Sequence, residues 1–318
     1  MKIQRLFFIF IIFYCLSVKA QNKQFLYGFK EIPQSLLENP GGQVDFNKHI
    51  GIPFLSGIYL NAATSNKLIS SLFANDGVDV SDKYQTVIHE LTTKDFLTIN
   101  EQIEVFNIGY RLKNTKDYIS FGFYQELDLI AYHPKDIAIL YYQGNNDSNG
   151  NLDLNRNFNL NDINYKGEAF GVFHIGVSRK INKKLNIGTR IKLYSGAYNI
   201  QSINNNGEIN TQQDNNNNLQ TVINNLDAKF KTSGLTGIST GNSISNAIKN
   251  GLSGRNLGLG LDVGFTYHFK DNLTLSGSVL DLGFIHYSKD IKTYSIKGDI
   301  EINGLNILNP PTDKPLDY

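Results

Sequence analysis

The stretch from Leu257 to Phe269, which reads LGLGLDVGFTYHF, alternates strictly between two kinds of residue. Its odd-numbered positions are all apolar or aromatic, and its even-numbered positions are glycine, polar or charged. A period of two over such a length predicts a β-strand with one apolar face and one small or polar face. Further strands are predicted at 49–61, 105–113, 118–130, 169–180, 185–198, 273–280 and 293–303.

The chain begins with the features of an export signal. Two basic residues precede an apolar run from Leu6 to Leu16, and Val18-Lys19-Ala20 fits a cleavage site. Residues 1–20 are therefore predicted to be a signal peptide, and their apolar run is too short for a membrane-spanning helix. Removing them also removes Cys15, the one cysteine of the sequence, so the exported chain has no disulfide option.

The exported chain has little net charge. Without Lys2, Arg5 and Lys19, the 30 basic residues become 27, against 29 acidic ones. There is no basic surplus to indicate nucleic acid as a partner. Because no later run of apolar residues is long enough to span a bilayer as a helix, the exported chain is either soluble or a β-barrel.

The connections between the predicted strands alternate in length. Short turns at 114–117, 182–184 and 270–272 alternate with long links at 131–168, 199–256 and 281–292. Outer-membrane barrels have short periplasmic turns and longer outside loops. A soluble antiparallel sheet also has one apolar and one polar face. The export signal, the sorted connections and the charges on the polar faces nevertheless favour an all-β fold, a transmembrane antiparallel β-barrel over residues 21–318.

Two segments depart from this rhythm. A helical insertion is predicted within 65–100, because Tyr84, Val87, Ile88 and Leu91 have the spacing of an amphipathic helix. The link 199–256 is rich in asparagine, and such a composition does not bury enough apolar surface to offset its ordering entropy. We predict a mobile surface loop there.

The polar faces of the predicted strands carry titratable side chains that we expect to line the barrel lumen. These lumen candidates are Glu126, Asp128, Arg190, Lys192, Asp262 and His268. They either line a polar permeation path or pair across the lumen and plug it, and a small barrel favours the plug. Aromatic girdles at the membrane interfaces are predicted from Tyr110, Tyr124, Tyr194, Tyr198, Tyr267, Tyr287 and Tyr294.

No motif in the sequence predicts catalysis or a cofactor. The G-x-S-x-G match at 237–241 lies in a polar link rather than between a strand and a helix, where a nucleophile elbow belongs. A calcium-loop spacing is present, but Arg156 stands where a bidentate glutamate is needed, and an ordinary turn explains the same residues. We therefore predict no enzyme activity, no cofactor and no metal. The weak calcium candidates are Asn145, Asp147, Asn149 and Asp153.

Four blocks of the sequence, 39–59, 132–145, 173–196 and 258–287, resemble a known family, and Leu280-Asp281-Leu282-Gly283 is the most specific piece. They are similar to an uncharacterised outer-membrane β-barrel family of the Bacteroidota. That family distantly resembles FadL-type fatty-acid channels and PorV-type barrels. The resemblance implies that residues 21–46 form a hatch folded into the lumen, with Asn39 and Pro40 as its motif.

Members of that family run beyond this length and end in an amphipathic strand. This chain ends in residues 309–318, where three prolines are incompatible with a ladder strand. We therefore expect C-terminal strands to be missing. The resemblance implies a porin-like protein of the cell outer membrane that passively transfers a small hydrophobic molecule. The alternative is a non-transporting scaffold or accessory of a secretion or surface-assembly machine. The expected partners are outer-membrane lipid and either a hydrophobic ligand or a protein.

Overall fold

The computed structural model describes residues 26–52, 56–65, 71–113, 116–132, 135–146, 151–154, 156–213, 219–235, 256–270 and 272–302. The predicted signal peptide and the G-x-S-x-G match lie outside these residues. The helices are α2 (Ser35–Glu38), α3 (Val80–Glu90) and α4 (Lys135–Gln143). The strands are β1 (Lys48–Ile50), β2 (Ile58–Thr64), β3 (Phe96–Arg111), β4 (Asp117–Tyr132), β5 (Phe158–Asn159), β6 (Tyr165–Lys180), β7 (Leu185–Gln213), β8 (Leu219–Ser233), β9 (Asn256–Lys270), β10 (Leu273–Ile285) and β11 (Ile291–Ile302).

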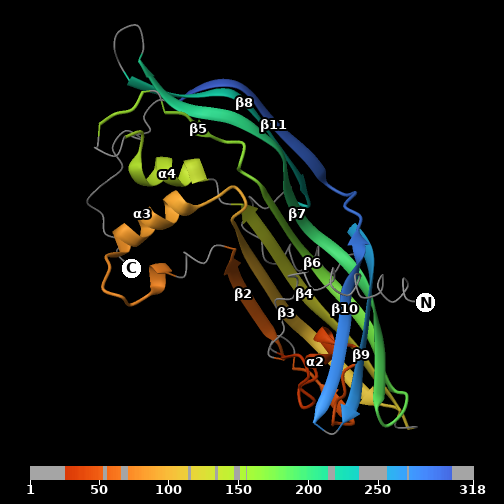
Figure 1. The fold of residues 1–318 in the computed structure, drawn as a ribbon. Coiled ribbons are helices and arrows are strands. Elements are labelled where there is room, and N and C mark those ends of the chain that lie inside the picture. The colour runs from red at the N-terminus through yellow and green to blue at the C-terminus, as the bar shows by residue number, and fades with distance from the viewer. Residues whose placement is uncertain are drawn as a thin grey trace, which may run out of the picture.

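These strands form one antiparallel sheet, curved into a trough (Figure 1). Its centre is the ladder β3-β4-β6-β7, with β1 and β2 on the free side of β3. The long strand β7 has two partners along its other edge, because residues 185–196 pair with β9 and residues 199–213 pair with β8. β10 then adds to β9, and β11 adds to β8.

The expected all-β architecture is confirmed, but the sheet is not closed into a barrel. Among the described residues, the edge formed by β1 and β2 does not pair with β10 at the other end of the sheet. None of the described helices is long and apolar enough to cross a membrane.

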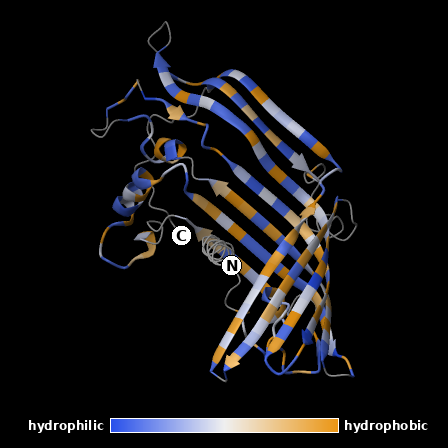
Figure 2. Cartoon of the chain, turned by 45° about the vertical axis from the view of Figure 1, so that its right-hand side comes forward, coloured by the Kyte–Doolittle hydropathy of each residue, from blue (hydrophilic) through white to orange (hydrophobic). Residues whose placement is uncertain are grey.

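The two faces of β9 have opposite environments. The apolar residues of its first half are exposed, whereas the alternate positions Gly258, Gly260 and Asp262 are buried. A similar alternation of burial runs along the first part of β7 and the second half of β6, and the alternation of hydropathy appears as stripes in Figure 2. We call the side of the sheet with the exposed apolar side chains the outer face, and the opposite side the inner face. Its exposed apolar side chains include Ile175, Val177, Ile187, Ile191, Leu193, Leu257, Leu259, Leu261, Val263, Phe265, Leu275, Val279, Leu282 and Phe284.

The helices α3 and α4 and the short strand β5 form an upper lobe in the upper left of the view in Figure 1. They pack on the C-terminal part of β7 and on β8. This upper lobe has a conventional core in which apolar residues are buried. The carboxylate of Asp79 accepts a hydrogen bond from the backbone N–H of Ser81 and so caps α3 at its N-terminus. The core residues are Ile88, Ile139, Leu140, Phe158, Leu160 and Ile209.

Three expectations about local structure are wrong in part. The helix predicted within 65–100 is limited to α3, and β3 already begins at Phe96. The single strand expected at 49–61 is two short strands, β1 and β2.

The asparagine-rich link is not a loop over its described length, because residues 199–213 and 219–233 form the β7–β8 hairpin. Its amide side chains bond within the hairpin: Asn204 Nδ2 donates to the Asp227 carbonyl, and Asn224 Nδ2 donates to Asn210 Oδ1. Ile209 and Val222 are buried at the same time. Composition was misleading because the apolar residues here are few but well placed.

Candidate functional site

Residues 26–46, which we call the N-terminal segment, lie against the inner face of the sheet. Side chains from distant strands hold it there. Gln34 Nε2 donates to Glu104 Oε1 of β3 at 3.1 Å, and Ser278 Oγ of β10 donates to the Glu38 carbonyl at 2.7 Å. The segment takes no part in the sheet ladder. The structure thus places the described part of the expected hatch on the inner face.

The turn Asn39-Pro40-Gly41-Gly42 is the most heavily bonded part of this segment. Asn39 Oδ1 accepts from the Gly41 N–H at 2.9 Å, which closes the turn, and Asn39 Nδ2 donates to the Phe265 carbonyl of β9 at 3.1 Å. From β7, Asn186 Nδ2 donates to the carbonyls of Gly41 and Gly42 at 2.9 and 2.8 Å. Both side chains are buried, so these bonds are shielded from water.

Three glycines allow the backbone of the turn to pack directly against the backbone of the strands. A Cβ atom added to Gly188 would overlap the Pro40 carbonyl, and one added to Gly264 would overlap the Asn39 side chain. A Cβ on Gly41 would overlap the backbone of Gly264. Two of these clashes are with backbone, which cannot rotate away as a side chain can. Gly188, Gly264 and Gly41 therefore form a fitted contact between the wall and the turn.

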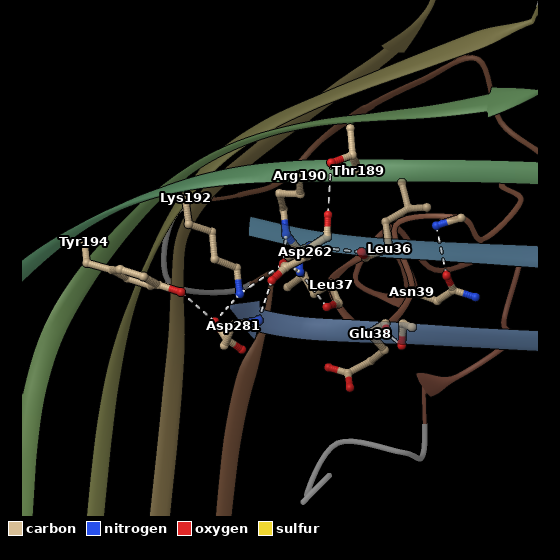
Figure 3. A network of polar contacts seen from close by, with 12 residues as sticks. Leu36, Leu37, Glu38, Asn39, Thr189, Arg190, Lys192, Tyr194, Asp262 and Asp281 are labelled. Carbon is tan, nitrogen blue, oxygen red and sulfur yellow. Dashed lines mark hydrogen bonds and ion pairs between the residues drawn. The ribbon is translucent and has the colours of Figure 1, made fainter. Parts of the chain in front are cut away.

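Next to the turn lies an ionic cluster of Arg190 and Lys192 from β7, Asp262 from β9 and Asp281 from β10 (Figure 3). Arg190 Nε donates to Asp262 Oδ2 at 2.7 Å, and Lys192 Nζ lies 3.1 Å from the same oxygen. Arg190, Lys192 and Asp262 are 3%, 2% and 0% exposed. Asp281 is exposed, and its Oδ1 lies 2.5 Å from Lys192 Nζ. Two positive and two negative charges therefore meet in one place.

Asp281 reaches the cluster because β10 is irregular there. The β9–β10 register shifts between Val279 and Leu282, and Asp281 has the left-handed φ of 56°. In this bulge, the backbone N–H of Asp281 donates to Asp262 Oδ1 at 2.6 Å. Tyr194 Oη donates to Asp281 Oδ1 at 2.8 Å. The bulge thus turns the Asp281 carboxylate toward the cations of β7.

Arg190 also links the cluster to the N-terminal segment (Figure 3). Its two terminal nitrogens donate to the carbonyls of Leu36 and Leu37 at 2.9 and 2.6 Å. These carbonyls belong to the single turn α2, where they have no partner within a helix. One guanidinium therefore bonds both to the carboxylate of Asp262 and to the segment that covers the sheet.

The structure brings together Arg190, Lys192 and Asp262 of the six lumen candidates. The other three have different neighbours. Asp128 accepts from Asn100 Nδ2 at 2.6 Å, Glu126 lies opposite Gln102 in the β3–β4 ladder, and His268 Nδ1 lies 2.9 Å from Thr274 Oγ1. Arg190, Lys192 and Asp262 thus pair with one another between the neighbouring strands β7 and β9 of the open sheet, not across a closed lumen.

Sequence reasoning missed Asp281, Tyr194 and the fitted glycines as parts of this site. Tyr194 and Tyr124, expected in an aromatic girdle, are instead buried on the inner face. A signal for Asp281 was present, because Val279 and Leu280 are consecutive apolar residues that break the alternation of β10. Nothing in one strand alone indicates which glycine meets another segment.

The weak calcium candidates are only partly described. Asn145 is buried and its carbonyl accepts from the Asp153 N–H at 2.9 Å, whereas Asp147 and Asn149 lie outside the described residues. The described part of the chain holds no group of three or more His, Cys, Asp or Glu residues placed to bind a metal ion.

Residues 40–317 match the family described as "Family of unknown function (DUF5723)". Neither the curated proteins nor the solved structures contain a match to the chain.

Proposed function

The chain belongs to the family of unknown function DUF5723, and from the geometry of its sheet we propose that it forms wall strands of an outer-membrane β-barrel. In this proposal the outer face contacts lipid and the N-terminal segment fills the interior. The protein acts as a non-transporting scaffold or accessory in that membrane.

The inverted burial of the sheet carries the proposal. On β9, Leu259 is 56% exposed whereas Asp262, three residues away, is 0% exposed. Leaving one large apolar side chain in water forgoes about 1.5–3 kcal/mol of burial free energy, and the outer face repeats this many times. Contiguous apolar surface of this kind marks a membrane or protein contact. Lipid would satisfy the outer face without any rearrangement of the strands.

Strand lengths agree with this assignment. β3, β4 and β6 have 16 residues each, and β9 has 15. A tilted strand needs about 9–11 residues to cross the hydrocarbon core. The strands are thus long enough to cross and to extend beyond the membrane.

The contents of the inner face favour a scaffold over the passive transfer of a small hydrophobic molecule. The N-terminal segment and the ionic cluster occupy the inner face at β7 and β9. Transfer remains the second candidate, because side chains rather than strand pairing hold the segment, so it has a route to detach. Native mass spectrometry of the purified protein separates the two roles. A stoichiometric apolar small molecule would favour transfer, and its absence would favour the scaffold.

The membrane assignment is tested by fluorescence at two isoleucines of β7. Ile191 is 57% exposed beside the ionic cluster, and Ile203 is 53% exposed in the asparagine-rich part of the same strand. Each is replaced by cysteine in a chain carrying Cys15→Ser, and each thiol receives an environment-sensitive dye. We expect nitroxide-bearing lipids to quench the dye at position 191 and not at 203. Unquenched dyes at both positions, on a protein found in the soluble fraction, would refute the proposal.

A further inference from the structure

The inner face of the sheet offers several side-chain hydrogen-bond donors to the backbone carbonyls of the N-terminal segment, and it accepts hydrogen bonds from the Gln34 and Asn39 side chains. Arg190 donates to two carbonyls of α2, and Ser278 donates to a third, that of Glu38. Asn186 donates to Gly41 and Gly42, and Ser178 Oγ also donates to the Gly42 carbonyl at 2.8 Å. Side chains of β6, β7 and β10 therefore donate hydrogen bonds to the backbone carbonyls of the N-terminal segment.

The shape of the same surface selects a particular turn. The turn lies so close to Gly188 and Gly264 that neither strand position has room for a side chain. Both polar atoms of the Asn39 side chain are hydrogen-bonded. Its Oδ1 accepts from the Gly41 N–H within the turn, and its Nδ2 donates to the Phe265 carbonyl of β9. Side-chain donors that meet backbone carbonyls, and glycines that fit closely against a turn, are features with which a surface can bind a peptide.

We propose that the surface formed by β6, β7, β9 and β10 is a peptide receptor selective for an Asn-Pro-Gly-Gly turn, and that the N-terminal segment is its tethered ligand. The receptor accepts the same turn from a separate peptide once the tethered copy is displaced. Tethering gives the internal copy an effective concentration in the millimolar range, so a free peptide does not compete with it in the wild-type chain. This inference goes beyond the scaffold role and does not depend on the membrane assignment.

The test releases the tethered copy without altering the receptor. In full-length Gly41→Ala, the new methyl group overlaps the backbone of Gly264, so the segment should leave. A nitroxide attached at position 31, which is exposed, reports the release as increased mobility. A fluorescent peptide of residues 33–46 with the natural sequence is then added, and its anisotropy is measured.

Two controls locate the interaction. A peptide carrying Gly41→Ala should bind the released chain at least about tenfold more weakly than the natural peptide, a ratio well resolved in titrations. Full-length Gly188→Ala should also release its segment, but it should not bind the natural peptide, because its methyl group overlaps the Pro40 carbonyl. In Gly167→Ala the three atoms nearest to the new methyl group belong to Ile200, Leu129 and Asp128 rather than to the N-terminal segment, so this variant should keep its segment docked.

The outcomes are decisive in both directions. Saturable binding of the natural peptide to Gly41→Ala, with loss of binding in both controls, supports the receptor. Equal binding to Gly188→Ala, no binding to released Gly41→Ala, or a segment still docked in Gly41→Ala would overturn it. If Gly41→Ala does not fold, Asn39→Ala replaces it, since that variant loses the amide bond to Phe265 but adds no atom. Peptide binding should then follow the fraction of released segment.

Discussion

Arg190 and Asp262 are direct neighbours across the β7–β9 ladder, and their side chains meet at 2.7 Å on the covered face of the sheet. A buried ion pair gains Coulomb energy but loses hydration, so it stabilises only when its remaining hydrogen-bonding atoms are also satisfied. Here the guanidinium bonds to two carbonyls of α2, and the carboxylate also contacts Lys192 and the Asp281 N–H. The pair is thus completed by the bulge and by the N-terminal segment.

Asp262→Ala should therefore be strongly destabilising. It would leave Arg190 buried without the carboxylate that it bonds, and removal of one partner from a buried pair costs about 3–5 kcal/mol. The free energy of unfolding, measured by urea denaturation of the protein in detergent or liposomes, tests this value. Lys297→Ala breaks the Lys297–Asp227 pair of the exposed strand β11 and should cost about 0–1 kcal/mol. Similar small losses in both variants would show that Asp262 does not have this role.

Asp281 should respond to substitution through its backbone as well as its charge. Asparagine tolerates the left-handed region, whereas alanine in that region costs about 1 kcal/mol or more. Both Asp281→Asn and Asp281→Ala remove the charge, so their difference reports the backbone conformation together with the hydrogen bonds that an asparagine oxygen still accepts from Lys192 and Tyr194. We expect Asp281→Ala to unfold at lower urea concentration than Asp281→Asn. The reverse order would mean that the bulge does not constrain this residue.

The sequence predicted the strands well because alternation is a local property. The alternation within β9 is enough to tell which residues lie on which face of the sheet. Pairing β9 with β7, which also alternates, then puts Arg190 and Asp262 on the same face. The fitted glycines could not be predicted in this way. Gly188 meets Pro40, which is far away in the sequence, and a glycine on a polar face looks the same whether it meets a segment, water or nothing.

Propensity gave the wrong result where tertiary packing decides the structure. The asparagines of the link 199–256 predict a loop, but Ile209 packs into the core beneath α4 and fixes the strand. In α3, the helical spacing around Val87 and Ile88 is correct, but it does not indicate where β3 begins. Composition underestimates how much stability an apolar residue contributes when its packing partners come from distant elements.

The turn before α3 should lose stability in acid. The Lys83 ammonium, 2.5 Å from Asp76 Oδ1, lowers the pKa of that carboxyl below its ordinary value of 3.8, and the Val78 N–H adds to the effect. Because the folded pKa is depressed, the contribution is present above the ordinary pKa and is lost as the pH falls through the folded pKa. Hydrogen exchange of α3, corrected for the intrinsic pH dependence, should show protection that decreases in this range. In Asp76→Asn this decrease should be absent, and an unchanged profile would rule out the coupling.

The lipid-facing assignment of the outer face predicts unequal costs for the same charge on one strand. Ile191→Arg and Ile203→Arg change residues of the same type and of nearly equal exposure on β7. If position 191 faces hydrocarbon, arginine there should cost about 2–4 kcal/mol, as it does near the midplane of outer-membrane barrels. At position 203, in the asparagine-rich part beyond the apolar surface, the cost should be close to zero. The measurement is reversible folding into phospholipid vesicles in urea. In a sheet surrounded by water, both substitutions would be nearly neutral, so equal small effects would exclude the bilayer as the environment of the outer face.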